Sequence, residues 1–525
     1  MSDNAHLLGI DVGTSGCKVL LIDTNGAVVA DETREYPLSL PRPLWSEHNP
    51  EDWWAAVSSG ITLVLHASGI KASQIAGVGL TGQMHGLVLL DAAGKVLRPC
   101  ILWNDQRTAA QCATITQRVG AERVLQLTGN PVLTGFTAPK LLWVRENEPE
   151  IFARIAHVLL PKDYIRYRLT GEFFGDVSDS SGTSLFDVAK RQWSGEMLAA
   201  LDAPRTWMPE VTESPVASTH VSAAAAKETG LVAGTPVIAG AGDQAAGAVG
   251  NGIIEEGPIS VTLGTSGVVF AASNEYRVEP EGRLHAFCHA VPGKWHLMGV
   301  MLSAGGSFEW FCEQFGLKAM IEQFARIDRS VEKMRADDIN GDHELLTAGA
   351  ESIPPGAEGL FFLPYLTGER TPHADPHARG AFIGLTPRHG LAHLTRAVLE
   401  GVSYGLRDSL ELMRALGLPI TQVRASGGGA KSPLWRQILA DVFQAEIAAL
   451  QITQGAAYGA ALLAGVGAGV FADVTAACKI TLSRLDRTTP RGAAQVYQDH
   501  YRIFSTLYPT LKSTFTEITR LVGDS

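Results

Sequence analysis

Residues 7–22 read LLGIDVGTSGCKVLLI, two apolar runs separated by the turn Gly13-Thr14-Ser15-Gly16. The same tetrapeptide returns at Gly264–Gly267, again after an apolar run and about half of the 525-residue chain later. A repeated strand, glycine turn and strand predicts two related α/β domains, each offering backbone N–H groups and a hydroxyl to one polyphosphate ligand. The copies differ at one position, because the first run carries Asp11 where the second carries Thr262.

The first copy continues through Thr24-Asn25-Gly26, a hairpin turn, into the apolar residues 27–30. Three consecutive antiparallel strands are therefore expected. Dinucleotide-binding and Walker-type loops run from their glycines straight into a helix. The spacing here fits neither of those motifs.

Hydrophobic periodicity extends the α/β plan through the rest of the chain. Small residues 241–252 separate the two copies, which predicts domains at 1–252 and 253–525. The uncharged tract Ala456–Ala472 is mostly Ala and Gly, which favours a buried, closely packed helix over a membrane span. The other expected elements are helices at Trp53–Ser68, Arg107–Val119, Leu391–Met413 and Ser432–Phe443, and strands at Ile75–Leu80, Thr235–Gly240 and Gln422–Ser426.

Composition favours a small-molecule ligand. The chain has 43 basic and 54 acidic residues, a formal net charge of −11, without long charge runs. Nothing in this balance favours nucleic acid or an anionic membrane as a partner. The six cysteines show no metal-ligand spacing and suit reduced thiols in the cytoplasm, and the N-terminus has no export-signal pattern.

Asp11 ends the first strand immediately before a predicted phosphate turn. A carboxylate in that position is the expected holder of Mg²⁺ in phosphoryl transfer, and the alternative is an aspartate that caps the turn. Lys18 follows two residues after the turn and is a candidate for a transferring phosphate, although a solvated lysine fits the pattern nearly as well.

Asp243 stands alone among residues with almost no side chain, in the stretch AGAGDQAAG at 239–247. Small neighbours let a ligand approach, and a lone carboxylate there is suited to accept the proton of an attacking hydroxyl. Asp243 is therefore the candidate base. The alternative is that Asp243 caps the Ala-rich helix that follows.

Two loops supply further candidate groups. Gln83, Met84 and His85 follow the strand Ile75–Leu80 and could bind sugar hydroxyls, whereas a lone histidine is more often a loop residue satisfied by backbone. Gly427-Gly428-Gly429 would let a nucleoside lie against bare backbone, and a plain helix-entry turn explains the pattern equally well.

Longer motifs resemble those of the FGGY carbohydrate kinases, from about Leu7 to about Ala472. The segments GFTAPKLLW at 135–143 and GAFIGL at 380–385, with 393–400 after it, are similar to the two family signatures. Four more segments resemble the family's xylulose-kinase branch: LWSE at 44–47, QMHG at 83–86, LWND at 102–105 and LPKDY at 160–164.

The resemblance implies a duplicated ribonuclease-H-like, actin-like ATPase fold with a cleft between its domains. It further implies phosphorylation of D-xylulose to D-xylulose 5-phosphate, with ATP and Mg²⁺ bound and closure of the domains over the substrates. Asp243 would be the catalytic base, and Asp11 and Asp243 the metal ligands. The implied sugar contacts are Gln83, Met84, His85, Trp103, Asp243 and Gln244, and the implied ATP contacts are Thr14, Ser15, Lys18, Gly264, Thr265, Gly428 and Gly429.

Two positions depart from the family pattern, since Gln244 stands where related kinases often have Asn and Lys18 where glycerol kinases have Arg. Three alternatives stay open: a kinase of the same family for ribulose, another ketose or a sugar acid; an actin-like ATPase that transfers phosphate only to water; and a module that only binds. The helical pattern of Ala493–Leu511 predicts a terminal helix that packs on the second domain or makes a subunit contact, as in a homodimer.

Overall fold

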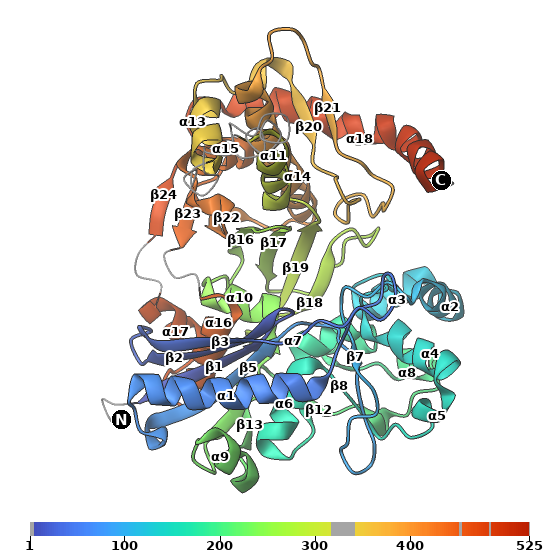
Figure 1. Cartoon of the computed structure of the whole chain (residues 1–525), viewed down its shortest axis with the longest axis vertical. Coiled ribbons are helices and arrows are strands. Elements are labelled where there is room, and N and C mark those ends of the chain that lie inside the picture. The colour runs from blue at the N-terminus through green and yellow to red at the C-terminus, as the bar shows by residue number, and fades with distance from the viewer. Residues whose placement is uncertain (1–4, 317–341, 451–453, 482–484, 524–525) are drawn as a thin grey trace, which may run out of the picture. The chain divides into compact units, whose positions relative to one another are not determined.

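The computed structural model describes residues 5–316, 342–450, 454–481 and 485–523. The chain forms two compact units (Figure 1). One holds Met1–Glu255, Ala272–Leu297 and Gln454–Ser483, and the other holds Glu256–Ala271, Met298–Thr453 and Arg484–Ser525. All six cysteines are thiols.

The first copy of the glycine turn joins β1 to β2, which pair antiparallel as expected. Gly13 N–H donates to the Gly16 carbonyl at 3.0 Å and closes the turn. The sheet around them has the order β13-β14-β5-β1-β2-β3, with β15 also paired to β5. Its strands are β1 (His6–Val12), β2 (Gly16–Asp23), β3 (Val28–Glu35), β5 (Ile75–Gly82), β13 (Ala217–His220), β14 (Pro236–Ile238) and β15 (Ala241–Gly242).

Two helices cover opposite faces of this sheet. Helix α1 (Pro50–Ser68) begins with the Asn49 side chain accepting from Glu51 N–H, and Gly69 ends it with φ +66°. It packs Trp53, Val57 and Ile61 onto the face that bears Ile10 and Val19. Helix α16 (Gly455–Gly467) lies on the other face, against β1 and β5.

Helix α16 confirms the expectation that the Ala and Gly tract is a buried, closely packed helix. A Cβ on Gly9 would lie 2.0 Å from the Ala457 carbonyl oxygen, and one on Gly79 would lie 1.9 Å from that of Ala460. Only glycine in the strands lets the helix backbone approach so closely. Among the described helices none is long and apolar enough to cross a membrane.

The first unit also holds four short strand pairs and ten further helices among its described residues. Helix α2 begins two residues later than the pattern predicts, because Asp105 Oδ1 accepts Arg107 N–H and holds that residue in a turn. The pairs are β4 (Glu47–His48) with β7 (Cys100–Ile101), β6 (Val88–Leu90) with β8 (His157–Leu159), β9 (Phe174–Asp176) with β12 (Glu210–Thr212), and β10 (Phe186–Asp187) with β11 (Gln192–Trp193). The helices are α2 (Ala109–Val119), α3 (Ala121–Thr128), α4 (Thr137–Asn147), α5 (Pro149–Phe152), α6 (Pro161–Thr170), α7 (Val177–Ser180), α8 (Gly195–Ala200), α9 (Ala223–Thr229), α10 (Asp243–Gly250) and α17 (Val474–Thr481).

The second copy repeats the arrangement of the first. Strands β16 and β17 pair antiparallel around the turn at Gly264, and β16 pairs parallel with β22, as β1 does with β5. This confirms the predicted duplication. The sheet order is β18-β19-β17-β16-β22-β23-β24. Its strands are β16 (Gly257–Leu263), β17 (Gly267–Ser273), β18 (His285–Cys288), β19 (Trp295–Met301), β22 (Ile420–Ser426), β23 (Ile447–Leu450) and β24 (Leu485–Thr488).

The helices of the second unit surround the long, half-buried α14, whose extent matches the predicted 391–413 pattern. The C-terminal α18 packs on α14 and α15, with Tyr497 Oη donating to Glu400 Oε1 at 2.9 Å and Tyr501 Oη to Asp408 Oδ1 at 2.6 Å. The predicted packing of a terminal helix on the second domain is thereby confirmed. The elements are α11 (Gly305–Phe315), α13 (Asp342–Glu351), α14 (Leu391–Ala415), α15 (Pro433–Phe443), α18 (Ala494–Gly523) and the hairpin β20 (Phe361–Leu363) with β21 (Ala381–Ile383).

Candidate active site

The carboxyl ends of β1, β5 and β15 lie side by side at one edge of the first sheet. These strands run parallel, with Asp11 opposite Thr81 and Thr81 opposite Ala241. Asp243 follows Ala241 by two residues, so the topology gathers both candidate carboxylates at this edge. Ligand sites of α/β sheets commonly form at such strand ends.

Asp11 does not act as a turn cap. Its Oδ1 is buried and makes no hydrogen bond within the described residues, and the same holds for Oγ1 of the adjacent Thr81. Burial raises the pKa of Asp11 to about 6, and the nearby Lys18 ammonium lowers it by a smaller amount. Two unsatisfied oxygens on neighbouring strand ends leave room for a ligand to complete their bonding.

Asp243 is the first residue of α10, and its neighbour Gly242 occupies the N-cap position. The Oδ1 atom accepts the N–H of Gln244 at 2.7 Å. Burial raises the pKa of Asp243 to about 7, and the negative charge of Asp11 adds to the rise. A carboxylate whose pKa lies near neutrality is a better proton acceptor than an ordinary aspartate.

The Lys18 side chain is partly buried, and its ammonium makes two polar contacts within the first unit. Its Nζ donates to Gln454 Oε1 and lies 3.5 Å from Asp31 Oδ2. Gln454 comes 436 positions later in the sequence, immediately before α16, so no local pattern could have predicted this contact. A role for Lys18 toward ATP stays a prediction.

Thr14, Gln83 and Trp103 form a chain of hydrogen bonds beside the glycine turn. Trp103 Nε1 donates to Thr14 Oγ1 at 2.9 Å, and Thr14 Oγ1 donates to Gln83 Oε1 at 3.4 Å. Gln83 Nε2 donates to the Gly13 carbonyl at 3.0 Å. Trp103 is 40% exposed and Ser15 is also exposed, so both residues can be reached by a ligand.

Met84 lies directly against the end of β15, immediately before Asp243. A Cβ on Gly242 would be 3.1 Å from Met84 Cγ and Sδ, and one on Gly182 would be 3.0 Å from Met84 Cε. The thioether side chain is thus held by two glycines, one of them next to the candidate base. This contact joins the β5–β6 loop to the start of α10.

His85 occupies the left-handed region, with φ +69°, and its ring is fixed on two sides. The ring stacks on Phe136 with a centroid separation of 4.4 Å, and Nδ1 lies 2.6 Å from the Gly182 carbonyl oxygen. Because a carbonyl only accepts, Nδ1 carries the proton, and Nε2 is the acceptor nitrogen of the neutral ring. The backbone contact expected of an ordinary loop histidine is present, and it also sets the tautomer.

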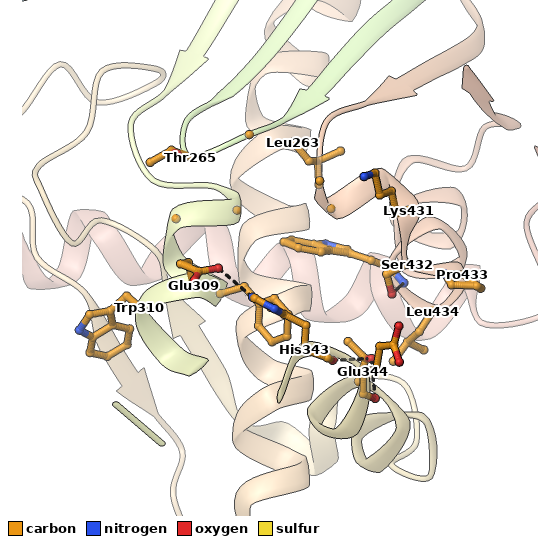
Figure 2. Close-up of a pocket in the computed structure, with 18 of the residues that line it drawn as sticks. Leu263, Thr265, Glu309, Trp310, His343, Glu344, Lys431, Ser432, Pro433 and Leu434 are labelled. Atoms are coloured by element: carbon orange, nitrogen blue, oxygen red, sulfur yellow. Dashed lines mark hydrogen bonds and ion pairs between the residues drawn. The ribbon is translucent and has the colours of Figure 1, made fainter. Parts of the chain in front are cut away.

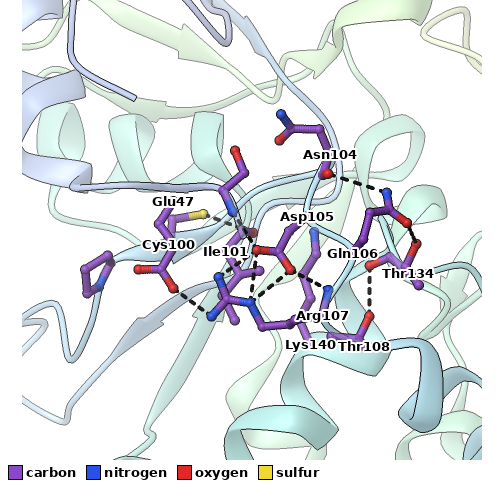
Figure 3. A network of polar contacts seen from close by, with 12 residues as sticks. Glu47, Cys100, Ile101, Asn104, Asp105, Gln106, Arg107, Thr108, Thr134 and Lys140 are labelled. Atoms are coloured by element: carbon purple, nitrogen blue, oxygen red, sulfur yellow. Dashed lines mark hydrogen bonds and ion pairs between the residues drawn. The ribbon is translucent and has the colours of Figure 1, made fainter. Parts of the chain in front are cut away.

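A buried polar network holds the loop that carries Trp103, and sequence reasoning missed it (Figure 3). The guanidinium of Arg107 lies 2.6 Å from Asp105 Oδ2 and 2.8 Å from Glu47 Oε1, and 3.6 Å above the ring of Trp45. Asp105 Oδ2 also accepts Ser46 N–H at 2.7 Å. The network fixes the loop on the C-terminal side of Trp103.

The glycines of the second copy line a pocket of about 950 Å³ that lies wholly within the second unit (Figure 2). Gly264, Thr265, Gly428 and Gly429 all contribute, so the structure brings together all four predicted nucleotide residues of this half. Gly429 begins a short 3₁₀ turn, so the helix-entry interpretation of the glycine run also holds.

Sequence reasoning missed the walls of this pocket. Gly305 and Gly306 face the glycine turn, and a Cβ on Gly305 would lie 2.5 Å from the Gly264 carbonyl oxygen. Phe308 and Trp435 supply aromatic surface, with ring centroids 5.8 Å apart. Figure 2 also shows the contact between His343 and Glu309, whose Nε2 and Oε2 are 2.8 Å apart.

Carboxylate oxygens are ligands that Mg²⁺ prefers, and the ion commonly uses only one or two of them together with phosphate oxygens and water. Asp11 and Asp243 fit that donor set, and Asp11 Oδ1 has its bonding capacity unused. Within the described residues no group of three or more His, Cys, Asp or Glu side chains is placed to hold a metal.

Comparison with family models matches both halves of the chain. Residues 6–250 match the N-terminal domain of the FGGY family of carbohydrate kinases, and residues 259–468 match the C-terminal domain. The chain belongs to this family. The duplicated actin-like fold and the carbohydrate kinase class implied by the sequence resemblance are thereby confirmed.

Several similar FGGY proteins carry the name xylulose kinase. That of Escherichia coli (strain K12) is 46% identical over 83% of this chain and 84% of its own length. That of Klebsiella pneumoniae is 41% identical over 96% and 99%. The crystal structure of a "xyloylose kinase" from Brucella ovis has 40% identity and a TM-score of 0.87, and the match covers 97% of this chain and all of that chain.

Proposed function

We propose that this FGGY kinase transfers the γ-phosphoryl group of ATP to D-xylulose and forms D-xylulose 5-phosphate. The observation that carries the proposal is the grouping, within the first unit, of Asp243 with Met84 and His85 at one sheet edge. The names of the similar proteins support D-xylulose as the sugar. Under this proposal residues 1–252 bind the sugar, the metal and, through the first glycine turn, phosphate, and residues 253–525 bind the nucleotide through the second glycine turn.

Asp243 is proposed to remove the proton from the terminal hydroxyl of the sugar as its oxygen attacks the γ-phosphorus in line. Its raised pKa, due first to burial and then to Asp11, gives the carboxylate the basicity for this step. Gln244 holds one carboxylate oxygen by its N–H, which leaves the other to face the hydroxyl. Phosphoryl transfer needs little covalent chemistry from the protein, so this orientation is the main contribution.

Met84 and His85 would set the orientation of the sugar. Met84 offers an apolar surface for the carbon chain, next to Gly242 at the end of β15. The tautomer of His85 makes Nε2 the ring acceptor for a sugar hydroxyl. Gln83, Trp103 and Gln244 complete the proposed sugar contacts.

Asp11 and Asp243 would hold Mg²⁺, which supplies charge neutralisation for the phosphates when bound. Thr14, Ser15 and Lys18 are proposed to face the transferring phosphate from the first unit. In the second unit, Thr265 is proposed to offer its backbone N–H and hydroxyl to the phosphates, beside Gly264, whose own N–H donates to the Ser266 carbonyl at 3.1 Å. Gly428 and Gly429 offer a flat backbone surface to the nucleoside, beside Trp435.

Release of ADP measured across a panel of sugars tests the proposal. We expect turnover to rise strongly with D-xylulose and little with glycerol, ribulose or gluconate. Preference for another sugar would keep the family assignment and overturn the substrate. Equal ADP release with and without every sugar would instead support the alternative of an actin-like ATPase.

A further inference from the structure

Lys140 is a fully buried lysine whose ammonium contacts backbone carbonyls. It lies in α4, and its Nζ donates to the His85 carbonyl at 2.9 Å and to the Gly135 carbonyl at 2.6 Å. No ion pair to Lys140 is present within the parts of the chain that the structure describes. A buried cation without a carboxylate is expensive, so its retention needs a reason other than stability.

One of the two carbonyls belongs to a loop that carries proposed sugar contacts, and the other, just before α4, packs against a second such loop. His85 lies in the β5–β6 loop, three residues after the end of β5. Gly135 packs on the loop of Trp103, because a Cβ there would lie 2.4 Å from the Trp103 carbonyl oxygen. One side chain therefore ties the His85 loop to the Trp103 loop, and Figure 3 shows Lys140 beside Asp105 and Arg107, which anchor the latter.

The conformation of His85 explains why such a tie is needed. A non-glycine residue at φ +69° is strained and persists only where its surroundings hold it. Lys140 and the Thr137 hydroxyl, which donates at 3.0 Å, both hold the carbonyl. Without them the peptide would relax toward negative φ and turn the imidazole away from its place beside Met84.

We propose that Lys140 is a positioning residue of the sugar site, which fixes the main chain of His85 against the Trp103 loop and so places the imidazole for the sugar. This inference deepens the proposed function and rests on it. Lys140 touches neither substrate in this scheme and acts only through the His85 and Gly135 carbonyls.

The number of hydrogen bonds agrees with this role in either protonation state. Burial lowers the pKa of Lys140 to about 7; the neighbouring Cys100, Asp105 and Cys112 raise it, and Arg107 lowers it further. A neutral amine keeps two N–H groups, which match the two carbonyl acceptors. The tie therefore survives loss of the proton.

The first test replaces Lys140 with Met, which keeps the length of the side chain and removes every donor. Loss of the two bonds should raise the KM for D-xylulose by about tenfold or more, while the KM for ATP changes by less than about twofold. Isothermal titration with D-xylulose alone should show the same loss of affinity. Lys294→Met is the matched control, because Lys294 Nζ donates to the Ile254 carbonyl at 2.9 Å and contacts no proposed sugar residue.

A double-mutant cycle with His85→Ala separates positioning from general support of the fold. If Lys140 acts through His85, Lys140→Met should change the sugar KM by less than about twofold in the His85→Ala background. Equal effects in both backgrounds, or an unchanged sugar KM in Lys140→Met, would overturn the inference. If Lys140→Met does not fold, Thr137→Val removes the other donor to the same carbonyl and should raise the sugar KM in the same direction, by a smaller factor.

The wild-type protein distinguishes failure of the proposed function from failure of this inference. If the proposed function is wrong, the wild type shows neither turnover with D-xylulose nor binding of D-xylulose in the titration. In that case the same variants are measured with the sugar that the panel identifies. An unchanged KM for that sugar in both Lys140→Met and Thr137→Val would overturn the positioning role by itself.

Discussion

Asp243 is the residue on which proton transfer depends in the proposed mechanism. Asp243→Ala should keep the fold and the binding of ADP, because the nucleotide residues proposed for the second unit are untouched. Sugar phosphorylation should fall by about 10²- to 10⁴-fold, the usual contribution of a positioned base. Coupled ADP-release assays measure the loss, and a thermal melt confirms folding.

Asp499→Ala is the matched control, since this aspartate is exposed on α18 and its side chain accepts only from Gln495 Nε2, at 3.3 Å, within the described residues. Its activity should stay within about twofold of the wild type, as surface substitutions usually do. Full sugar-kinase activity in Asp243→Ala would remove Asp243 as the base.

Asp11 and Asp243 lie at the same edge of the first sheet, so the charge of Asp11 should affect the pKa of Asp243. In the metal-free protein Asp243 has a pKa of about 7, raised first by burial and then by the negative charge of Asp11. Asp11→Asn removes that charge, which favours the ionised form of Asp243, so the pKa of Asp243 should fall while staying above that of an ordinary aspartate. Carboxyl ¹³C NMR of metal-free protein against pH measures the change, and an unchanged or higher pKa of Asp243 would contradict the electrostatic effect of Asp11.

At the scale of elements, helix α16 depends on glycines in the strands beneath it. Gly79→Ala would place a Cβ 1.9 Å from the Ala460 carbonyl oxygen, a backbone atom that cannot rotate away. We expect a loss of about 1 to 3 kcal/mol or more in the free energy of unfolding of this unit, the cost of overpacking. Denaturant unfolding followed by circular dichroism measures it.

Gly247→Ala in α10 is the control for this experiment, because a Cβ there meets nothing within 4 Å. Replacing a helical glycine by alanine should be neutral or stabilise by about 0.5 to 1 kcal/mol. A Gly79→Ala protein as stable as the wild type would show that α16 can shift away from the sheet.

The comparison of elements also shows what the pattern of residues can predict. The turn at Gly13 and the three antiparallel strands follow from local spacing, because strand and turn chemistry is encoded within a few residues. The catalytic role of Asp243 stays a prediction. Two hydrogen bonds could not be predicted from local spacing: that of Lys18 to Gln454 and that of Lys140 to the His85 carbonyl. Each joins segments that only the tertiary fold brings together. The pattern of Ala456–Ala472 indicates a buried helix, but only the structure shows that it packs on β1 and β5.

At the scale of the whole molecule, the chain enters the first unit three times. The described part of 454–483 returns to β1 and β5 after the chain has built most of the second unit. Each unit nevertheless keeps its own set of proposed ligand residues, sugar residues in the first and nucleotide glycines in the second. The assignment of the sugar to the first unit and of the nucleotide to the second can therefore be tested with each ligand alone.

Hydrogen exchange should show separate protection by the two substrates. A ligand that binds the folded state suppresses local opening around its site, by a factor that grows with its concentration over Kd. ADP alone should slow exchange in α11, α15 and the turn at Gly264, which line the pocket of the second unit. D-Xylulose alone should slow exchange at Met84, His85 and the start of α10. Mass spectrometry of the exchanged protein locates each effect, with glycerol as the control polyol. The contrary outcome is protection by D-xylulose in α15 without protection at Met84 and His85. It would contradict the assignment of the sugar to the first unit, because a bound ligand is expected to protect the residues that it contacts.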